Sequence, residues 1–207
     1  CAACHSLNQV AFRDLAALGF TPAEIKAIAK KNDQPTIDEK TGDAATRPGL
    51  PSDKFYGPYA NDVAARAANN NALPPDLSLM TKAREHGNRY VYSLLTGYTN
   101  APAGWKVPAG LHYNPYFKSI NIAMPAPLTS EGQVEYTDGT KPTVDQMSKD
   151  VTAFLIWTAE PKLVERHKTG FGAVIFLLIM TGLGYLSYRR VWAEIKYKTK
   201  KGEVASA

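Results

Sequence analysis

The spacing of apolar residues along the 207-residue chain predicts a mainly helical structure. Apolar side chains recur three and four positions apart, which places them on one face of a helix. Thr21 with Glu24, and Thr143 with Gln146, form capping boxes that mark two helix starts. Together these signals predict helices over 6–18, 22–31, 62–68, 79–96 and 144–160, the fourth being a pair that meets at Gly87.

Turn-forming residues separate these helices. The stretch 32–58 is rich in Asp, Thr, Pro and Gly, which predicts a long surface excursion. Its acidic side chains could attract a basic partner, but a solvated loop explains them better. Asp138-Gly139, within 135–140, predicts a small β-hairpin.

Residues 171–188 form an uncharged run of 18 residues near the C-terminus, close to the roughly 20 that a membrane-spanning helix needs. A buried helix of a soluble core is the alternative, but no second segment is available to surround it. Basic residues follow the run directly, which places the C-terminus in the cytoplasm and the N-terminal domain on the opposite side of the membrane. These residues are Arg189, Arg190, Lys196, Lys198, Lys200 and Lys201. We therefore expect a domain at 1–165, a membrane anchor with its flanks at 166–192 and a basic cytoplasmic tail at 193–207.

The distribution of charge argues against nucleic-acid binding. The chain carries a formal net charge of +5, yet residues 1–165 hold 16 Lys and Arg against 17 Asp and Glu. Residues 166–207 hold 8 against 2, so the basic character belongs to the tail. A basic segment beside an apolar span indicates a membrane lipid surface as its partner.

The chain opens on Cys1-Ala-Ala-Cys4-His5, a pattern typical of covalent c-type haem attachment. In that chemistry the two thiols add to the haem vinyl groups and the histidine binds the iron. A thioredoxin-like pair would need a βαβ context, and a zinc site would need two further ligands at short spacing. Neither pattern is found, so we expect one covalent haem c per chain and a compartment outside the cytoplasm.

The position of Cys1 leads to a further expectation. Haem domains of this kind usually have a helix and a targeting segment before the motif, so we expect that the sequence lacks its beginning. A lipid-modified Cys1 is the other interpretation, but it would compete for the thiol that the haem needs.

The second axial ligand of the haem iron is expected from a methionine or a histidine. Met124 precedes the stiff Pro125-Ala-Pro127 segment, and a weak thioether ligand benefits from being held in place. His112 is the alternative and would give a lower potential. Three other methionines lie in an expected membrane span or in helical patterns, where core or surface roles are expected: Met80, Met147 and Met180.

Arg66 lies among alanines in the helix that precedes Asn69-Asn70-Asn71. Arginine suits the carboxylates of a buried haem, so Arg66 is a candidate propionate clamp. An exposed helix arginine explains the same residue nearly as well.

Several motifs together resemble the cytochrome c1 family, the membrane-anchored c-haem subunit of the cytochrome bc1 complex, in its bacterial form. They cover nearly the whole chain in the order of the family. The motifs are Cys1-Ala-Ala-Cys-His5, Ala65-Arg-Ala-Ala-Asn-Asn70, Ala72-Leu-Pro-Pro-Asp-Leu-Ser78, Tyr90-Val-Tyr-Ser-Leu-Leu-Thr-Gly-Tyr98, Asn114-Pro-Tyr-Phe117, Met124-Pro-Ala-Pro127 and Ala159-Glu-Pro161. One departure is Asn71, where the family usually has Gly; Asn also tolerates a left-handed backbone, so we expect the turn to survive.

The resemblance implies a mainly α, cytochrome c-like haem domain with long loops and a small β-hairpin, plus one C-terminal transmembrane helix. It implies that Cys1 and Cys4 attach the haem, His5 and Met124 bind the iron, and Arg66 contacts a propionate. The implied partners are cytochrome b, a Rieske iron–sulfur protein and a soluble or membrane-bound cytochrome c, in a dimeric complex.

The implied function is electron transfer from the Rieske protein to cytochrome c, as a redox subunit of a quinol–cytochrome c reductase. The implied place is the bacterial inner membrane, with the haem domain in the periplasm. Two alternatives stay open on the residues alone. One is a membrane-tethered cytochrome c that serves a terminal oxidase or nitric oxide reductase, and the other is a haem sensor or assembly protein.

Overall fold

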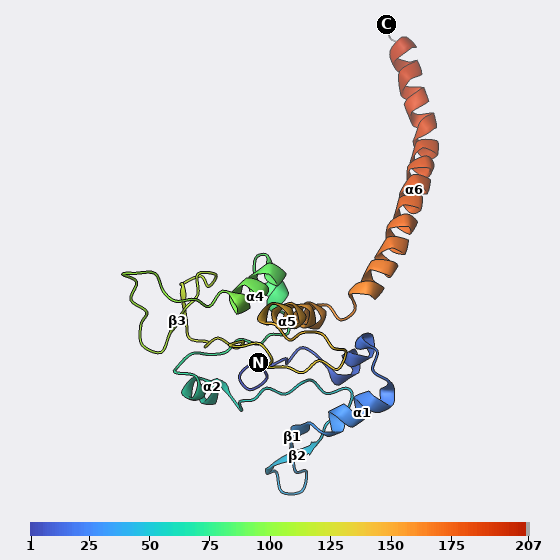
Figure 1. The fold of residues 1–207 in the computed structure, drawn as a ribbon. Helices are drawn as coiled ribbons and strands as arrows, with labels where there is room; N and C mark the ends of the chain where they lie inside the picture. The colour runs from blue at the N-terminus through green and yellow to red at the C-terminus, as the bar shows by residue number, and fades with distance from the viewer. Residues whose placement is uncertain (206–207) are drawn as a thin grey trace. The chain divides into compact units, whose positions relative to one another are not determined.

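The structure, a computed structural model, describes residues 1–205 and is mainly helical, as predicted (Figure 1). It comprises two compact units, Cys1–Pro161 and a second unit that begins at Lys162. In chain order the elements of the first unit are η1 (Phe12–Leu18), α1 (Pro22–Lys30), β1 (Asp33–Ile37), β2 (Ala44–Pro48), α2 (Asp62–Ala68), α3 (Met80–Ala83), α4 (Gly87–Thr96), β3 (His112–Tyr113), β4 (Asn121–Ile122) and α5 (Val144–Ala159).

Local capping explains where α1 and α5 begin. Thr21 Oγ1 accepts a hydrogen bond from the Glu24 backbone N–H at 3.3 Å, and the Glu24 carboxylate accepts one from the Thr21 N–H at 2.8 Å. Thr143 Oγ1 accepts from the Gln146 N–H at 3.1 Å in the same way. These contacts satisfy N–H groups that a helix start leaves unpaired, and they confirm both predicted helix starts.

The helix predicted over 6–18 was only partly right. The structure has a 3₁₀ helix, η1, that ends at Gly19 with φ of +92°. Upstream of it, the Asn8 N–H donates to the Asp76 carboxylate and the Gln9 N–H donates to Ser78 Oγ. The backbone N–H groups of Asn8 and Gln9 are therefore bonded to a distant segment, which competes with an α-helix at residues 6–11.

The hairpin predicted around Asp138-Gly139 was wrong. That stretch is a turn in which the Thr140 N–H donates to Asp138 Oδ1 at 2.9 Å, with Gly139 at φ +81°. Instead, β1 and β2 pair antiparallel within the expected surface excursion, with Asp33 opposite Pro48 and Ile37 opposite Ala44. A second antiparallel pair, β3 with β4, lies on either side of Asn114–Ile120. A small hairpin is thus present, but at positions whose composition favours loops.

Two hydrophobic clusters form the core of Cys1–Pro161. The first contains Phe12, Leu15, Ile25 and Ala29, with Ile28, Phe55 and Trp157 packed against it. The second contains Met80, Val91, Leu95 and Leu155, with Leu7, Leu77, Tyr90 and Val151 packed against it. Helix α5 contributes to both clusters, and Leu7 and Leu77 bring the segments around residues 6 and 76 onto the second one.

The second unit is a single long helix, α6 (Leu163–Ala205). Within the described part of the chain it is the one helix long and apolar enough to cross a membrane, over Leu163–Tyr197. Its apolar side chains are exposed, for example Phe171 at 72% and Leu178 at 68%. Exposure of this kind matches a lipid-facing anchor rather than a core helix. The predicted tail, 193–207, begins within α6, and its residues 206–207 lie outside the described residues.

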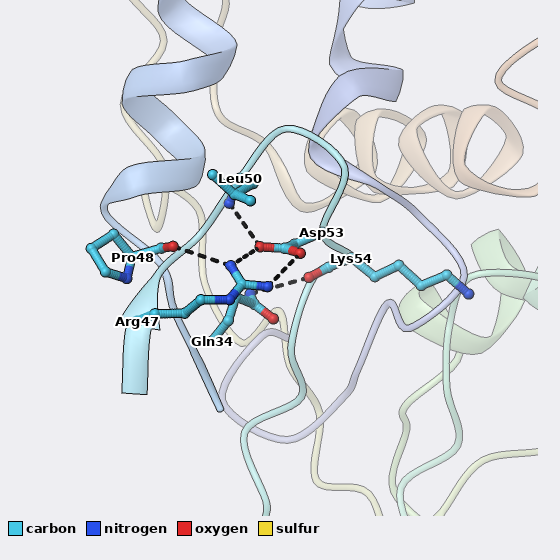
Figure 2. Close-up of polar contacts among 6 residues, drawn as sticks. All are labelled: Gln34, Arg47, Pro48, Leu50, Asp53 and Lys54. Atoms are coloured by element: carbon cyan, nitrogen blue, oxygen red, sulfur yellow. Dashed lines mark hydrogen bonds and ion pairs between the residues drawn. The ribbon is translucent and has the colours of Figure 1, made fainter. Parts of the chain in front are cut away.

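A bidentate ion pair closes the base of the β1–β2 hairpin (Figure 2). Arg47 Nη1 and Nη2 donate to the two carboxylate oxygens of Asp53 at 2.6 and 2.9 Å. The Leu50 N–H donates to the same carboxylate at 2.7 Å. The Arg47 hydrogen bonds, and then that of Leu50, lower the pKa of Asp53 to about 2.

This ion pair predicts a pH-dependent loss of stability. Because the pKa of Asp53 is depressed in the folded protein, its contribution is fully present above the ordinary value of 3.8 and is lost as pH falls toward about 2. We expect Asp53→Asn to be less stable than wild type at neutral pH and to lose less further stability between these pH values. The measurement is the unfolding temperature of the holoprotein against pH. Asp43→Asn, on the same hairpin, should keep the wild-type slope; equal slopes for Asp53→Asn and wild type would contradict the prediction.

Candidate haem-binding site

Residues Cys1–His5 form one tight turn. The backbone N–H groups of Cys4 and His5 both donate to the Cys1 carbonyl, at 3.0 and 2.9 Å. No disulfide joins the two cysteines; Cys1 is exposed and Cys4 is half-buried. Two thiols and an imidazole therefore lie on a single turn, which is the donor set that covalent haem attachment requires.

The His5 ring is oriented by a backbone carbonyl. His5 Nδ1 lies 2.8 Å from the Pro75 carbonyl oxygen. Because a carbonyl can only accept, Nδ1 carries the proton and the lone pair of the neutral ring lies on Nε2. Metal-bound histidines are held in this manner, with the second nitrogen donating to a carbonyl or carboxylate. The residues present therefore fit an iron ligand at His5 Nε2.

Segment 74–78 holds the chain that follows the Cys1–His5 turn through Asp76. Its carboxylate accepts from Ser6 Oγ at 2.8 Å, from the Asn8 N–H at 2.7 Å and from the Ser78 N–H at 2.8 Å. The Leu77 N–H donates to the Ser6 carbonyl at 2.9 Å. Burial raises the pKa of Asp76, but the hydrogen bonds from Ser78, Asn8 and Ser6 outweigh it, so the pKa lies below its ordinary value. The carboxylate stays ionised and holds residues 6–8 against this segment.

Two prolines make segment 74–78 a stiff support. Pro74 and Pro75 each have a ring that fixes φ, and Pro74 is itself restricted because a proline follows it. The carbonyl of Pro75 is thereby held in position for the His5 ring. Sequence reasoning gave this run as a family motif and did not assign a function to Pro75 or Asp76.

Tyr59 and Asn69 are site residues that sequence reasoning missed. The Tyr59 hydroxyl lies 3.8 Å from Cys4 Sγ, and Asn69 Nδ2 donates to that hydroxyl at 3.0 Å. Asn69 also caps α2 by donating to the Ala65 carbonyl at 2.7 Å. Asn69, at the end of α2, is therefore connected to Cys4 through the Tyr59 hydroxyl. Only the position of Asn69 in the Ala-Arg-Ala-Ala-Asn-Asn run pointed toward such a contact.

Arg66 braces the turn that follows α2. Its side chain is exposed, and Nη1 donates to the Asn71 carbonyl at 3.0 Å. The Asn71 N–H donates back to the Arg66 carbonyl at 2.9 Å. Asn70 and Asn71 adopt left-handed conformations with φ of +49° and +62°. The turn thus forms with Asn at position 71, as expected. A propionate contact for Arg66 stays a prediction.

Met124 is half-buried just beyond β4, after the buried Ile122. The Tyr98 hydroxyl donates to the Met124 carbonyl oxygen at 3.0 Å. Burial, and then the neighbouring Tyr90, raises the pKa of Tyr98 to about 12. The phenol is therefore protonated, and a donor, at any physiological pH.

The other candidates for the second axial ligand lie in different surroundings. His112 is exposed in β3, opposite Ile122. Met80 and Met147 are buried, at 8% and 2% exposure, in the helical core. Met180 lies on α6. Among the methionines, Met124 is in a loop that prolines stiffen, which is consistent with its predicted role without testing it.

A family model described as the Cytochrome C1 family matches residues 1–195. This chain belongs to the cytochrome c1 family. The match covers both the haem-motif unit and most of α6, and so agrees with the resemblance inferred from the sequence motifs.

Individual members of the cytochrome c1 family support the assignment. The chain is 48% identical over 197 residues to "Cytochrome c1-2, heme protein, mitochondrial" of Solanum tuberosum, covering 95% of this chain and 75% of that protein. It is 49% identical to "Cytochrome c1 1, heme protein, mitochondrial" of Arabidopsis thaliana, covering 95% of this chain but 64% of the relative. It is 44% identical to "Cytochrome b/c1" of Bradyrhizobium diazoefficiens, covering 94% and 31%. The chain thus spans about three-quarters of the first relative and under two-thirds of the second.

The Asp76 contacts predict a strong effect of a near-isosteric change. In Asp76→Asn the charge is lost and one carboxylate oxygen becomes an NH₂ donor that faces another donor. We expect the free energy of unfolding to fall by about 1.5–3 kcal/mol, the range for a hydrogen bond to a charged group. The measurements are the unfolding temperature and the yield of covalently attached haem. Glu131→Gln, an acid-to-amide change in an exposed loop, is the matched control; equal behaviour of the two variants would contradict a role for Asp76.

Proposed function

We propose that this chain is the membrane-anchored haem c subunit of a cytochrome bc1 complex. In this proposal it takes electrons from a Rieske iron–sulfur protein and passes them to a cytochrome c while the complex oxidises quinol. The observation that carries the proposal is the oriented His5 ring in a chain of the cytochrome c1 family. The ring donates a hydrogen bond from Nδ1 to the Pro75 carbonyl oxygen. The chain would act as a redox subunit of a quinol–cytochrome c reductase and would make no bond in a substrate.

The residues proposed to hold the haem follow from the donor set. Cys1 and Cys4 would form the thioether links, and His5 Nε2 with the Met124 sulfur would fill the two axial positions. Arg66 donates a hydrogen bond from Nη1 to the Asn71 carbonyl, and its guanidinium has further N–H donors that could bind a propionate. When bound, the haem supplies one-electron outer-sphere transfer, and a thioether ligand raises its potential.

The residues around the proposed ligands would serve that transfer by keeping the ligands in fixed positions. Pro75 and Asp76 fix the His5 side, and Pro125 with Tyr98 fixes the backbone on the Met124 side. An electron-transfer site works best when its ligands move little between the two redox states, because movement adds reorganisation to the barrier. Two filled axial positions would also keep small ligands away, which suits electron transfer and disfavours a gas sensor.

The proposed partners are cytochrome b, the Rieske protein and a soluble or membrane-bound cytochrome c, within a dimeric complex. The Bradyrhizobium relative, whose name joins cytochromes b and c1, supports the first of these. Helix α6 supports single-pass anchoring in lipid. We place the chain in the bacterial inner membrane, with the haem domain in the periplasm and the C-terminus in the cytoplasm. The family match disfavours a tethered oxidase donor and a haem sensor.

Replacing Met124 tests the proposed ligand set. Met124→Leu keeps the apolar volume but removes the thioether, so the midpoint potential should fall by on the order of 0.1 V or more, since axial ligands tune haem potentials over roughly 0.8 V. The measurement is a redox titration of the haem in membranes. Met147→Leu, at a methionine that is 2% exposed in α5, should keep the wild-type potential. An unchanged potential in Met124→Leu would rule Met124 out as a ligand.

Quinol-driven reduction in native membranes tests the place of the chain in a complex. An inhibitor that immobilises the Rieske protein at the quinol site should prevent reduction of this haem, because the electron would have to pass through that protein. Reduction that continues despite the inhibitor would instead indicate an independent tethered cytochrome. Carbon monoxide binding to the wild-type reduced haem at neutral pH, at the fast rate of a haem with an open axial position, would favour the sensor alternative.

A further inference from the structure

The hydrogen bond between Tyr98 and Met124 joins two segments that lie 26 positions apart. Tyr98 comes directly after Gly97, the C-cap of α4, and its hydroxyl donates to the Met124 backbone carbonyl at 3.0 Å. Both residues are half-buried. The bond acts on the backbone of the residue that we propose as an iron ligand, so it constrains where the side chain of that residue can reach.

Helix α4 also fixes the chain just before Met124. Asn114 is fully buried, its Nδ2 donates to the Leu94 carbonyl at 2.8 Å, and its N–H donates to the Ile120 carbonyl at 2.7 Å. Ile120 has a φ of +64°, a conformation that a β-branched residue adopts only when its surroundings impose it. The segment that leads into Met124 is therefore fastened to the last turn of α4.

The anchor itself is rigid. Val91 and Leu95, on α4, are buried in the core cluster that includes Leu155 of α5. At the end of α4, a Cβ on Gly97 would lie 2.3 Å from the Tyr116 ring, so the ring packs directly on the backbone there. Tyr98 follows Gly97 directly, so its backbone starts from a fixed position.

Pro125 restricts the backbone conformation of Met124. A residue before proline is driven to an extended conformation, so the carbonyl of Met124 has a narrow range of orientations. A single donor on that carbonyl is then enough to fix the peptide. With Asn114 on one side, prolines on the other and Tyr98 at Met124 itself, the loop is tied at three places.

We propose that Tyr98 is a positioning residue for the axial thioether. By tying the Met124 carbonyl to the end of α4, it keeps the sulfur at the iron and slows its departure. The inference rests on the proposed function, in which Met124 binds the haem. A thioether is a weak ligand, so the ligated population depends on how well its backbone is held. Loss of one typical hydrogen bond should change that population about fivefold.

The test uses Tyr98→Phe, which keeps the ring and removes only the hydroxyl. The full-length protein in its membrane complex is compared with wild type, with values expressed per covalently bound haem. We expect carbon monoxide to bind the reduced haem about fivefold faster, because binding must await departure of the thioether. The thioether-to-iron charge-transfer band of the oxidised haem should also be lost at a lower temperature than in wild type.

Tyr92→Phe is the matched control, because Tyr92 lies on α4, the helix that Tyr98 follows, and its hydroxyl donates to Asp145 of α5 at 2.6 Å. It loses a tyrosine hydrogen bond of α4 without touching the Met124 loop, so both haem signals should match wild type. A general effect of losing a phenol hydroxyl on or just after α4 would appear in both variants equally, and it would overturn a specific role for Tyr98.

Each outcome has one meaning. Weakened ligation in Tyr98→Phe but not in Tyr92→Phe supports the proposal. Wild-type behaviour of both variants, while Met124→Leu loses the charge-transfer band, overturns the role of Tyr98 and leaves the proposed function standing. A band that survives in Met124→Leu shows that Met124 is not the ligand, and it overturns the proposed ligand set together with this inference.

Discussion

The contact on which the site depends is the hydrogen bond from His5 Nδ1 to the Pro75 carbonyl at 2.8 Å, between residues 70 positions apart. A five-residue turn cannot by itself hold an imidazole in one orientation. The orientation comes from segment 74–78, whose prolines restrict the backbone and whose Asp76 takes up donors from residues 6 and 8. With that segment in place, Nδ1 of the ring donates to a carbonyl and Nε2 stays available for the proposed iron.

The same core supports both proposed iron ligands. Leu7 and Leu77 pack on the cluster of Met80, Val91, Leu95 and Leu155, so the His5 side rests on it. The Met124 side is tied through Tyr98 and Asn114 to α4, which supplies Val91 and Leu95 to that cluster. The positions of the two ligand segments are therefore set by packed helices rather than by the loops that carry the ligands. Packed side chains resist displacement, which suits a site whose task is to exchange electrons without rearranging.

The two units of the chain differ in how they expose their apolar side chains. Cys1–Pro161 buries its apolar residues in clusters, whereas the apolar side chains of α6 stay exposed along Leu163–Tyr197. A helix satisfies its own backbone hydrogen bonds, so it can cross a bilayer in which exposed apolar side chains are favourable. An exposed apolar helix of this length fits a lipid environment, in agreement with the membrane role proposed for the chain.

The sequence by itself determined the features that depend on neighbours within a few positions. Three such features could be predicted because each depends on local chemistry. They are the helix caps at Thr21 and Thr143, the motif of Cys1, Cys4 and His5, and the apolar run of α6. The family resemblance also came from the sequence, through motifs whose order matched along nearly the whole chain.

Only the tertiary structure decided features whose partners lie far apart in the chain. The helix predicted to start at residue 6 is absent from residues 6–11, where Asp76 and Ser78 accept from the backbone N–H groups of Asn8 and Gln9. The hairpin formed at Asp33–Pro48 and not at Asp138-Gly139, because turn residues permit a reversal but pairing needs two strands that match. The roles of Tyr59 and Tyr98 could not be predicted, since a tyrosine hydroxyl carries no sign of its acceptor until the chain folds and brings Cys4 and Met124 within reach.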